Sequence, residues 1–110
     1  MNRNDDQLCF TAVNEALQVI SGKWAFLVIS QLYYDTQRFN QLKRNLDPIS
    51  IKSLTDILRH LEQHQIIHRQ VIPTIPISVE YSLTEKGKAY RTVLLQMRQW
   101  GERWITNPDE

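Results

Sequence analysis

The chain has 110 residues, a formal net charge of +1 and a single cysteine. This length suits one domain, the nearly balanced charge gives no sign from composition alone of a nucleic-acid partner, and one cysteine excludes an internal disulfide. No apolar run approaches the roughly 20 residues of a membrane span, and the segment after Met1 lacks the features of a signal peptide. We therefore expect a cytoplasmic protein without membrane contact.

The first third of the chain predicts two helices. Residues 11–20 form the first, with Thr11 as its N-cap. Its apolar residues recur at helical spacing: Val13, Ala16, Leu17 and Ile20. After Gly22, the almost continuous apolar run 23–34 is too long for an ordinary strand and indicates a buried central helix. We expect three aromatic side chains in the core: Trp24, Phe26 and Phe39.

The middle third predicts a short strand-like link at 37–39, a helix from about Asn40 to before Pro48, and a helix that Ser50 caps. The last helix has one apolar stripe, formed by Ile51, Leu54, Ile57, Leu58 and Leu61. Its other side carries polar and charged residues: Lys52, Ser53, Thr55, Asp56 and Arg59. Residues 36–71 also carry six basic against three acidic side chains, a local charge of +3.

The last third predicts a β-hairpin and one long helix. The strands lie near 67–71 and 78–83, and Pro73 and Pro76 stiffen the loop between them. Thr84 caps the final helix. The apolar stripe of that helix consists of Tyr90, Val93, Leu94, Met97, Trp100 and Trp104.

This order of elements predicts a single domain, 1–110, that is mainly α with a small β-hairpin: a winged helix-turn-helix. Residues 39–63 form the helix-turn-helix, whose second helix would enter a DNA major groove, and 67–83 form the wing. We expect dimerisation through the terminal helices, about 9–20 and 84–104, because a chain this short exposes more apolar surface than it can bury alone. The same pattern also fits a protein-binding module.

Several stretches resemble the HxlR-type transcriptional regulators, a branch close to the MarR-like winged helices. The resemblance runs from Cys9 to Glu102. It is carried by "ISGKW" at 20–24, "RFNQLKR" at 38–44, the pattern of Ile49 to Glu62, "VEYSLTEKG" at 79–87 and "WGE" at 100–102. The resemblance implies a homodimer that binds operator DNA, with the first and last helices as the dimer interface. It implies no catalytic activity and no cofactor.

The polar residues of the predicted helix-turn-helix and wing are the candidate DNA contacts. They are Arg38, Lys43, Arg44, Ser50, Lys52, Ser53, Thr55, Arg59 and Arg69. The candidate dimer contacts are Val13, Leu17, Tyr90, Leu94, Met97, Trp100 and Trp104. The two-fold symmetry of such a dimer predicts a near-palindromic operator in double-stranded DNA.

Two residues depart from the pattern and leave other functions open. Ser78 stands where an arginine is usual in the wing, and Asp56 places a negative charge on the presumed groove face. Both favour an interaction module that has lost DNA binding.

A sensor is the other alternative. Cys9 stands where some members of the family carry a redox-active cysteine, although Phe10 replaces the proline that usually follows. Trp100 and Trp104 would line a pocket for an unknown small-molecule effector. His60 and His64 have the spacing of a metal-binding pair, but no further ligand completes the set, so we expect no metal. No catalytic motif is present, and we expect no enzyme.

Overall fold

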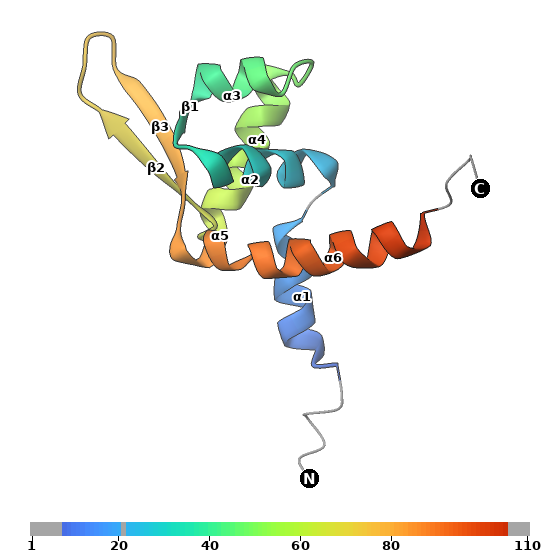
Figure 1. Ribbon diagram of the computed structural model, residues 1–110. Coiled ribbons are helices and arrows are strands. Elements are labelled where there is room, and N and C mark those ends of the chain that lie inside the picture. Colours follow the sequence, from blue (N-terminus) through green and yellow to red (C-terminus); the bar gives the residue numbers. More distant parts are fainter. Residues whose placement is uncertain (1–7, 21, 106–110) are drawn as a thin grey trace.

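The computed structural model describes residues 8–20 and 22–105 (Figure 1). The elements follow in the order α1 (Phe10–Val19), α2 (Lys23–Tyr34), β1 (Gln37–Arg38), α3 (Phe39–Asn45), α4 (Ile51–Gln63), β2 (Ile67–Ile72), β3 (Ser78–Leu83), α5 (Glu85–Ala89) and α6 (Arg91–Trp104). Helices dominate, and the only sheet in the described part is a small antiparallel one. The predicted fold class is therefore confirmed. Within the same residues, no helix is long and apolar enough to cross a bilayer.

The core lies where α2, α3 and α4 meet the sheet. Val28 and Ile29 of α2 pack with Leu42 of α3 and with Leu54 and Leu58 of α4, all of them at most 2% exposed. The predicted central helix is confirmed, since α2 has the bounds that its apolar run indicated. Its Gly22 takes a φ of 94°, a conformation that side-chain-bearing residues rarely adopt.

The sheet has the order β1-β3-β2, so the hairpin gains a third strand from the link before α3. Gln37 and Arg38 pair with Tyr81 and Glu80 of β3. On the other side of β3, the register runs from Ile67↔Leu83 to Ile72↔Ser78. Since β1 covers only the base of β3, the outer half of the hairpin projects beyond the body as a wing (Figure 1).

The junction between wing and last helix is different from the prediction. The expected single helix after Thr84 is wrong: it divides at Tyr90 (φ −64°, ψ −17°) into α5 and α6. Tyr90 is 8% exposed, and its hydroxyl donates to the carbonyl of Ala16 in α1 at 2.6 Å. Burial also raises the pKa of this phenol, which keeps it a donor. A tertiary contact therefore interrupts the helix at a residue whose local sequence favours continuation.

Three local predictions fail. Helix α1 begins at Phe10 with Cys9 as N-cap, so Thr11 is not the cap. Phe26 is 42% exposed rather than in the core, while Trp24 and Phe39 pack against the core from partly buried positions. Ile51 is 64% exposed. It lies in the first turn of α4, where the neighbouring elements do not yet cover the helix.

Helices α1 and α6 extend away from the body in different directions (Figure 1). Val19 is the one buried residue of α1, and no residue along the whole of α6 is buried. Large apolar side chains on both remain exposed: Phe10, Val13, Leu17, Met97, Trp100 and Trp104. These two helices therefore carry unpartnered apolar surface.

Candidate nucleic-acid interface

Helix α4 presents a polar face because its leucines all lie on the opposite side. Leu54, Leu58 and Leu61 are at most 2% exposed, which fixes the rotation of the helix about its axis. Its first turn is closed by the predicted cap, in which the Ser50 hydroxyl oxygen accepts from the backbone N–H of Ser53 at 3.0 Å. The side chains that remain on the outer face can reach a ligand that lies along the helix.

Most polar groups in the first half of that face are already engaged. Lys52 Nζ lies 2.9 Å from Asp56 Oδ2 in an exposed ion pair. The Ser50 hydroxyl donates to Ser53 Oγ at 3.0 Å, and the Thr55 hydroxyl donates to the carbonyl of Ile51 at 2.7 Å. Asp56 therefore has its charge balanced within the helix. It occupies the ammonium group of Lys52 rather than standing as an isolated negative charge.

The second half of α4 offers a cation. Arg59 lines a hollow between α4 and the sheet together with Thr55, Glu62 and Arg69, so the structure brings three of the predicted contacts together. Arg59 and Arg69 are exposed. Neither takes part in an ion pair among the described residues. Both guanidinium groups are therefore available to phosphate oxygens or base edges.

A groove of about 720 Å³ separates α3 from the wing. Arg38 and Arg44 line it on the α3 side, and residues 74–79 line it on the wing side. Arg38 Nε lies 3.8 Å from Glu80 Oε1, and both side chains keep substantial exposure. Lys43 follows in the last turn of α3 and is half-buried. The groove therefore has a cationic wall on one side and an uncharged wall on the other.

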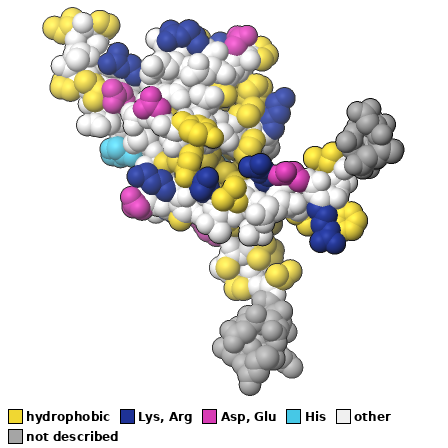
Figure 2. Space-filling view, in the orientation of Figure 1, with side chains coloured by type: hydrophobic (Ala, Val, Ile, Leu, Met, Phe, Trp, Pro, Cys, Tyr) yellow, Lys and Arg dark blue, Asp and Glu magenta, His cyan; other side chains and the backbone are white. Residues whose placement is uncertain are grey.

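The tip of the wing is apolar. Ile75 is 102% exposed and Ile77 is 69% exposed, and Figure 2 shows hydrophobic side chains gathered at the end of the hairpin. Ser78, where a wing cation was expected, is half-buried at the start of β3.

The histidines lie at the contact of α1 with α4, not on the groove face. His60 Nε2 bonds the carbonyl of Gln18 at 2.7 Å, which requires the proton on that nitrogen. His64 Nδ1 lies 4.0 Å from Glu15 Oε1. Lys86 Nζ, at 2.8 Å from the same oxygen, lowers the pKa of the Glu15 carboxyl. No group of three potential metal ligands occurs among the described residues. Local sequence gave no signal for this cluster, because its members are up to 71 residues apart.

A separate pocket of about 280 Å³ lies between α2 and α6. Its lining includes Phe26, Tyr33, Tyr34, Leu94 and Arg91, whose guanidinium stacks 4.8 Å from the Tyr33 ring centre. Neither Trp100 nor Trp104 lines it, contrary to the expectation for an effector pocket.

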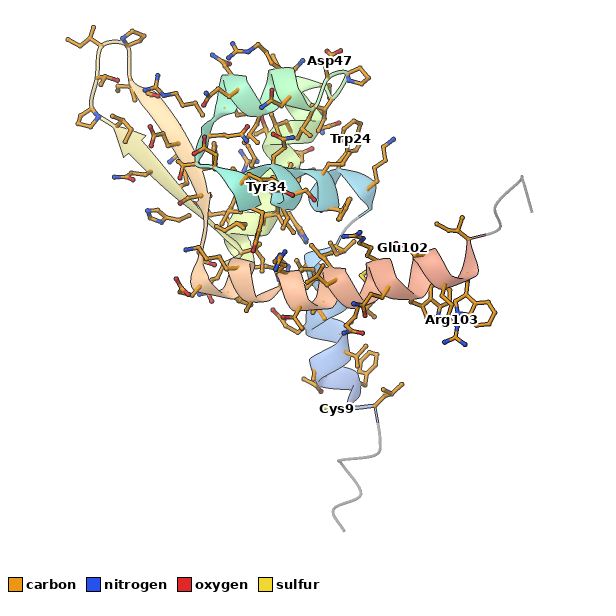
Figure 3. The ribbon with its side chains drawn as sticks, in the orientation of Figure 1. Cys9, Trp24, Tyr34, Asp47, Glu102 and Arg103 are labelled. Carbon is orange, nitrogen blue, oxygen red and sulfur yellow. The ribbon has the colours of Figure 1, made fainter. Side chains whose placement is uncertain are left out.

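The single cysteine is remote from the interface. Cys9 is exposed at the outer end of α1, away from α3, α4 and the wing (Figure 3).

A helix-turn-helix with an adjacent wing and exposed cations along both places this chain among the winged-helix transcriptional regulators, which are not enzymes. A sequence model of the HxlR-like helix-turn-helix family matches residues 19–109. The chain belongs to this family.

Individual relatives agree over most of the chain. The uncharacterised HTH-type transcriptional regulator YvaP of Bacillus subtilis strain 168 is 34% identical over 102 residues, which are 93% of this chain and 94% of that protein. The HTH-type transcriptional regulator YodB of the same strain is 35% identical over 97 residues, or 88% of this chain and 87% of that one.

Solved structures agree as well. Reduced YodB from B. subtilis has a TM-score of 0.81 at 33% identity and covers 90% of this chain and 96% of its own. The redox regulator HypR in its oxidised form has a TM-score of 0.75 at 38% identity, with 87% of this chain and 99% of its own covered.

Proposed function

We propose that this regulator acts as a homodimer that reads a near-palindromic operator, with α4 of each protomer in a major groove. The observation that carries the proposal is the outer face of α4, where Thr55 and Arg59 lie beside Arg69 of the wing. A helix is the element that fits the width of the B-form major groove, and an arginine at its surface pairs with guanine edges. The matching family consists of transcriptional regulators, which implies DNA binding.

The dimer is supported by the unpartnered apolar faces of α1 and α6. Leu17, Met97, Trp100 and Trp104 are each more than half exposed, and Val13 is 39% exposed. A contiguous apolar surface of this kind on a small protein is typical of a protein interface. Leu94 is partly buried, and Tyr90 supports the interface from inside the chain by holding the start of α6 against α1.

The proposed DNA contacts divide into two roles. Lys52, Ser53, Thr55 and Arg59 lie on α4, where they face base edges, and Ser50 presents its N-cap turn to the backbone. Arg38, Lys43, Arg44 and Arg69 surround α4 and hold phosphates on either side. We expect the half-sites to lie one helical turn apart, or a multiple of it, because both recognition helices must enter grooves on one face of the duplex.

The test is a fluorescence-anisotropy titration against a duplex that the parent protein selects from a random pool, and against a scrambled duplex. Arg59→Ala should cost roughly 1–3 kcal/mol on the selected duplex and relax preference at one base pair per half-site. Lys43→Ala should weaken both duplexes alike and reduce the salt slope by about one. Lys88→Ala, which removes a charge from α5 outside the interface, is the matched control. Equal binding by Arg59→Ala and the parent would refute the assignment of α4.

An effector-responsive sensor is the second candidate, and the pocket between α2 and α6 favours it. The pocket joins the helix-turn-helix to the proposed dimer helix, and Arg91 gives it a cation beside aromatic rings. A small aromatic anion bound there would contact both parts. Titration with 1-anilinonaphthalene-8-sulfonate should show saturable binding that Arg91→Gln weakens, and binding that the variant leaves unchanged would remove this candidate.

A further inference from the structure

The tip of the wing combines full exposure with an absence of charge. Residues 70–79 contain no charged side chain, although charged residues make up 23% of the chain. Ile75 and Ile77 at the tip, and Val71 at 48% exposure on β2, leave apolar surface in water. A wing that only touched phosphates would be served by lysine or arginine, so an apolar tip requires a different kind of contact.

The tip is also held in one shape. The Thr74 backbone N–H donates to the carbonyl of Ile72 at 2.8 Å, and the Thr74 hydroxyl donates to the carbonyl of Pro76 at 2.9 Å. Pro73 and Pro76 restrict φ on both sides of this turn. Ile75 therefore projects from a loop that loses little conformational entropy when it docks.

The surroundings of the tip favour DNA as its occupant. The groove behind the tip has Arg38 and Arg44 on its far wall, so a negatively charged strand that follows the groove would pass beside the apolar residues. The wing also borders the outer face of α4 through Arg69. A duplex whose major groove holds α4 presents its flanking minor groove to an element in this position.

We propose that Ile75, backed by Pro76, acts as an apolar wedge that enters the minor groove beside each half-site and partly unstacks one base step. This inference rests on the proposed DNA binding. Apolar side chains inserted in this way kink a duplex toward the major groove, and pyrimidine–purine steps yield most easily. The bend brings the backbone into the groove between α3 and the wing, where Arg38 and Arg44 bind phosphates.

The experiment uses the full chain and the duplex selected by the parent, labelled at both ends for energy transfer. A second copy of that duplex carries a fluorescent adenine analogue at the flanking step, whose emission rises on unstacking. The parent should shorten the end-to-end distance and raise the emission. Ile75→Ser should abolish both signals and weaken binding roughly tenfold, because it removes the buried apolar contact.

Two further variants separate a wedge from a general loss of contact. Ile75→Met keeps an apolar side chain of similar volume and should retain the bend. Ile75→Lys should steepen the salt dependence while losing the bend and the emission, because a cation contacts phosphates without unstacking bases.

Each outcome decides the matter. If the parent binds its duplex without bending it, or if Ile75→Ser bends it as the parent does, the wedge is refuted and the proposed function stands. If the parent binds no duplex even at low salt, both fail, and the apolar tip is then a surface for a protein partner.

Discussion

Replacement of Asp56 by asparagine should convert Lys52 from an internal partner into a phosphate contact. The pair is exposed, with side-chain exposure of 87% for Lys52 and 54% for Asp56, so its loss should lower the free energy of unfolding by only about 0.3–0.5 kcal/mol. On DNA the effect is larger. One added phosphate contact steepens the salt slope by about 0.9, so a change from roughly 50 to 200 mM salt reduces the affinity of the variant about 3.5-fold more than that of the parent. Two protomers on one operator square this factor to about 12.

The assay is an anisotropy titration at several salt concentrations, on selected and scrambled duplexes. Asp56→Asn should bind more tightly than the parent at low salt on both duplexes, because phosphate contacts carry no sequence information. The double variant Lys52→Ala, Asp56→Asn is the control and should lose the gain. A variant with the slope of the parent, or with lower affinity for the selected duplex alone, would refute the reasoning, and the second result would identify Asp56 as a base contact.

Three other changes test the scaffold and the thiol. Gly87→Ala should destabilise the fold by about 1–3 kcal/mol, because a Cβ there would lie 2.1 Å from the carbonyl oxygen of Ile66, whereas Gly101→Ala, with nothing within 4 Å, should be neutral or slightly stabilising in chemical denaturation. The ion pair with Lys86 lowers the pKa of Glu15, so its stabilisation is present above the pKa of the unfolded chain and is lost as pH falls through the lower folded value. Lys86→Ala should therefore flatten the acid limb of stability against pH, and an unchanged limb would contradict this. Any effect of diamide on DNA affinity should vanish in Cys9→Ser, since the chain has no second cysteine; a persisting effect would place the reaction elsewhere.

The elements that local sequence predicted well are those whose burial is decided within one helix or strand. The run 23–34 and the leucine stripe of α4 contain their own periodicity, and Ser50 is a cap by residue type and position. Even β1 was indicated as a link of strand character, and its pairing with β3 confirms it. These features carried the fold class from sequence alone.

The failures all depend on contacts between distant segments. The division of the last helix at Tyr90 requires the carbonyl of Ala16, which is 74 residues away. The position of His60 depends on Gln18 in the same manner. Phe26 is exposed because α2 continues past the elements that cover it, and only the tertiary arrangement shows where that cover ends. Lys52 and Asp56 are different, since their spacing of four predicts the pair, and the charge of Asp56 should have been considered together with its neighbour.

The junction at Thr84 separates what this protein is from what it reads. The Thr84 hydroxyl donates to the carbonyl of Gln65 at 2.6 Å and accepts from the N–H of Gly87 at 3.0 Å, while Gly87 allows α5 to approach Ile66. The segment "SLTEKG" therefore sets the angle between wing and terminal helix and makes no use of the outer face of α4. An engineer could exchange residues on that face, or the whole wing tip, and expect the joint to hold. The protein is in this sense a frame with a replaceable reading head.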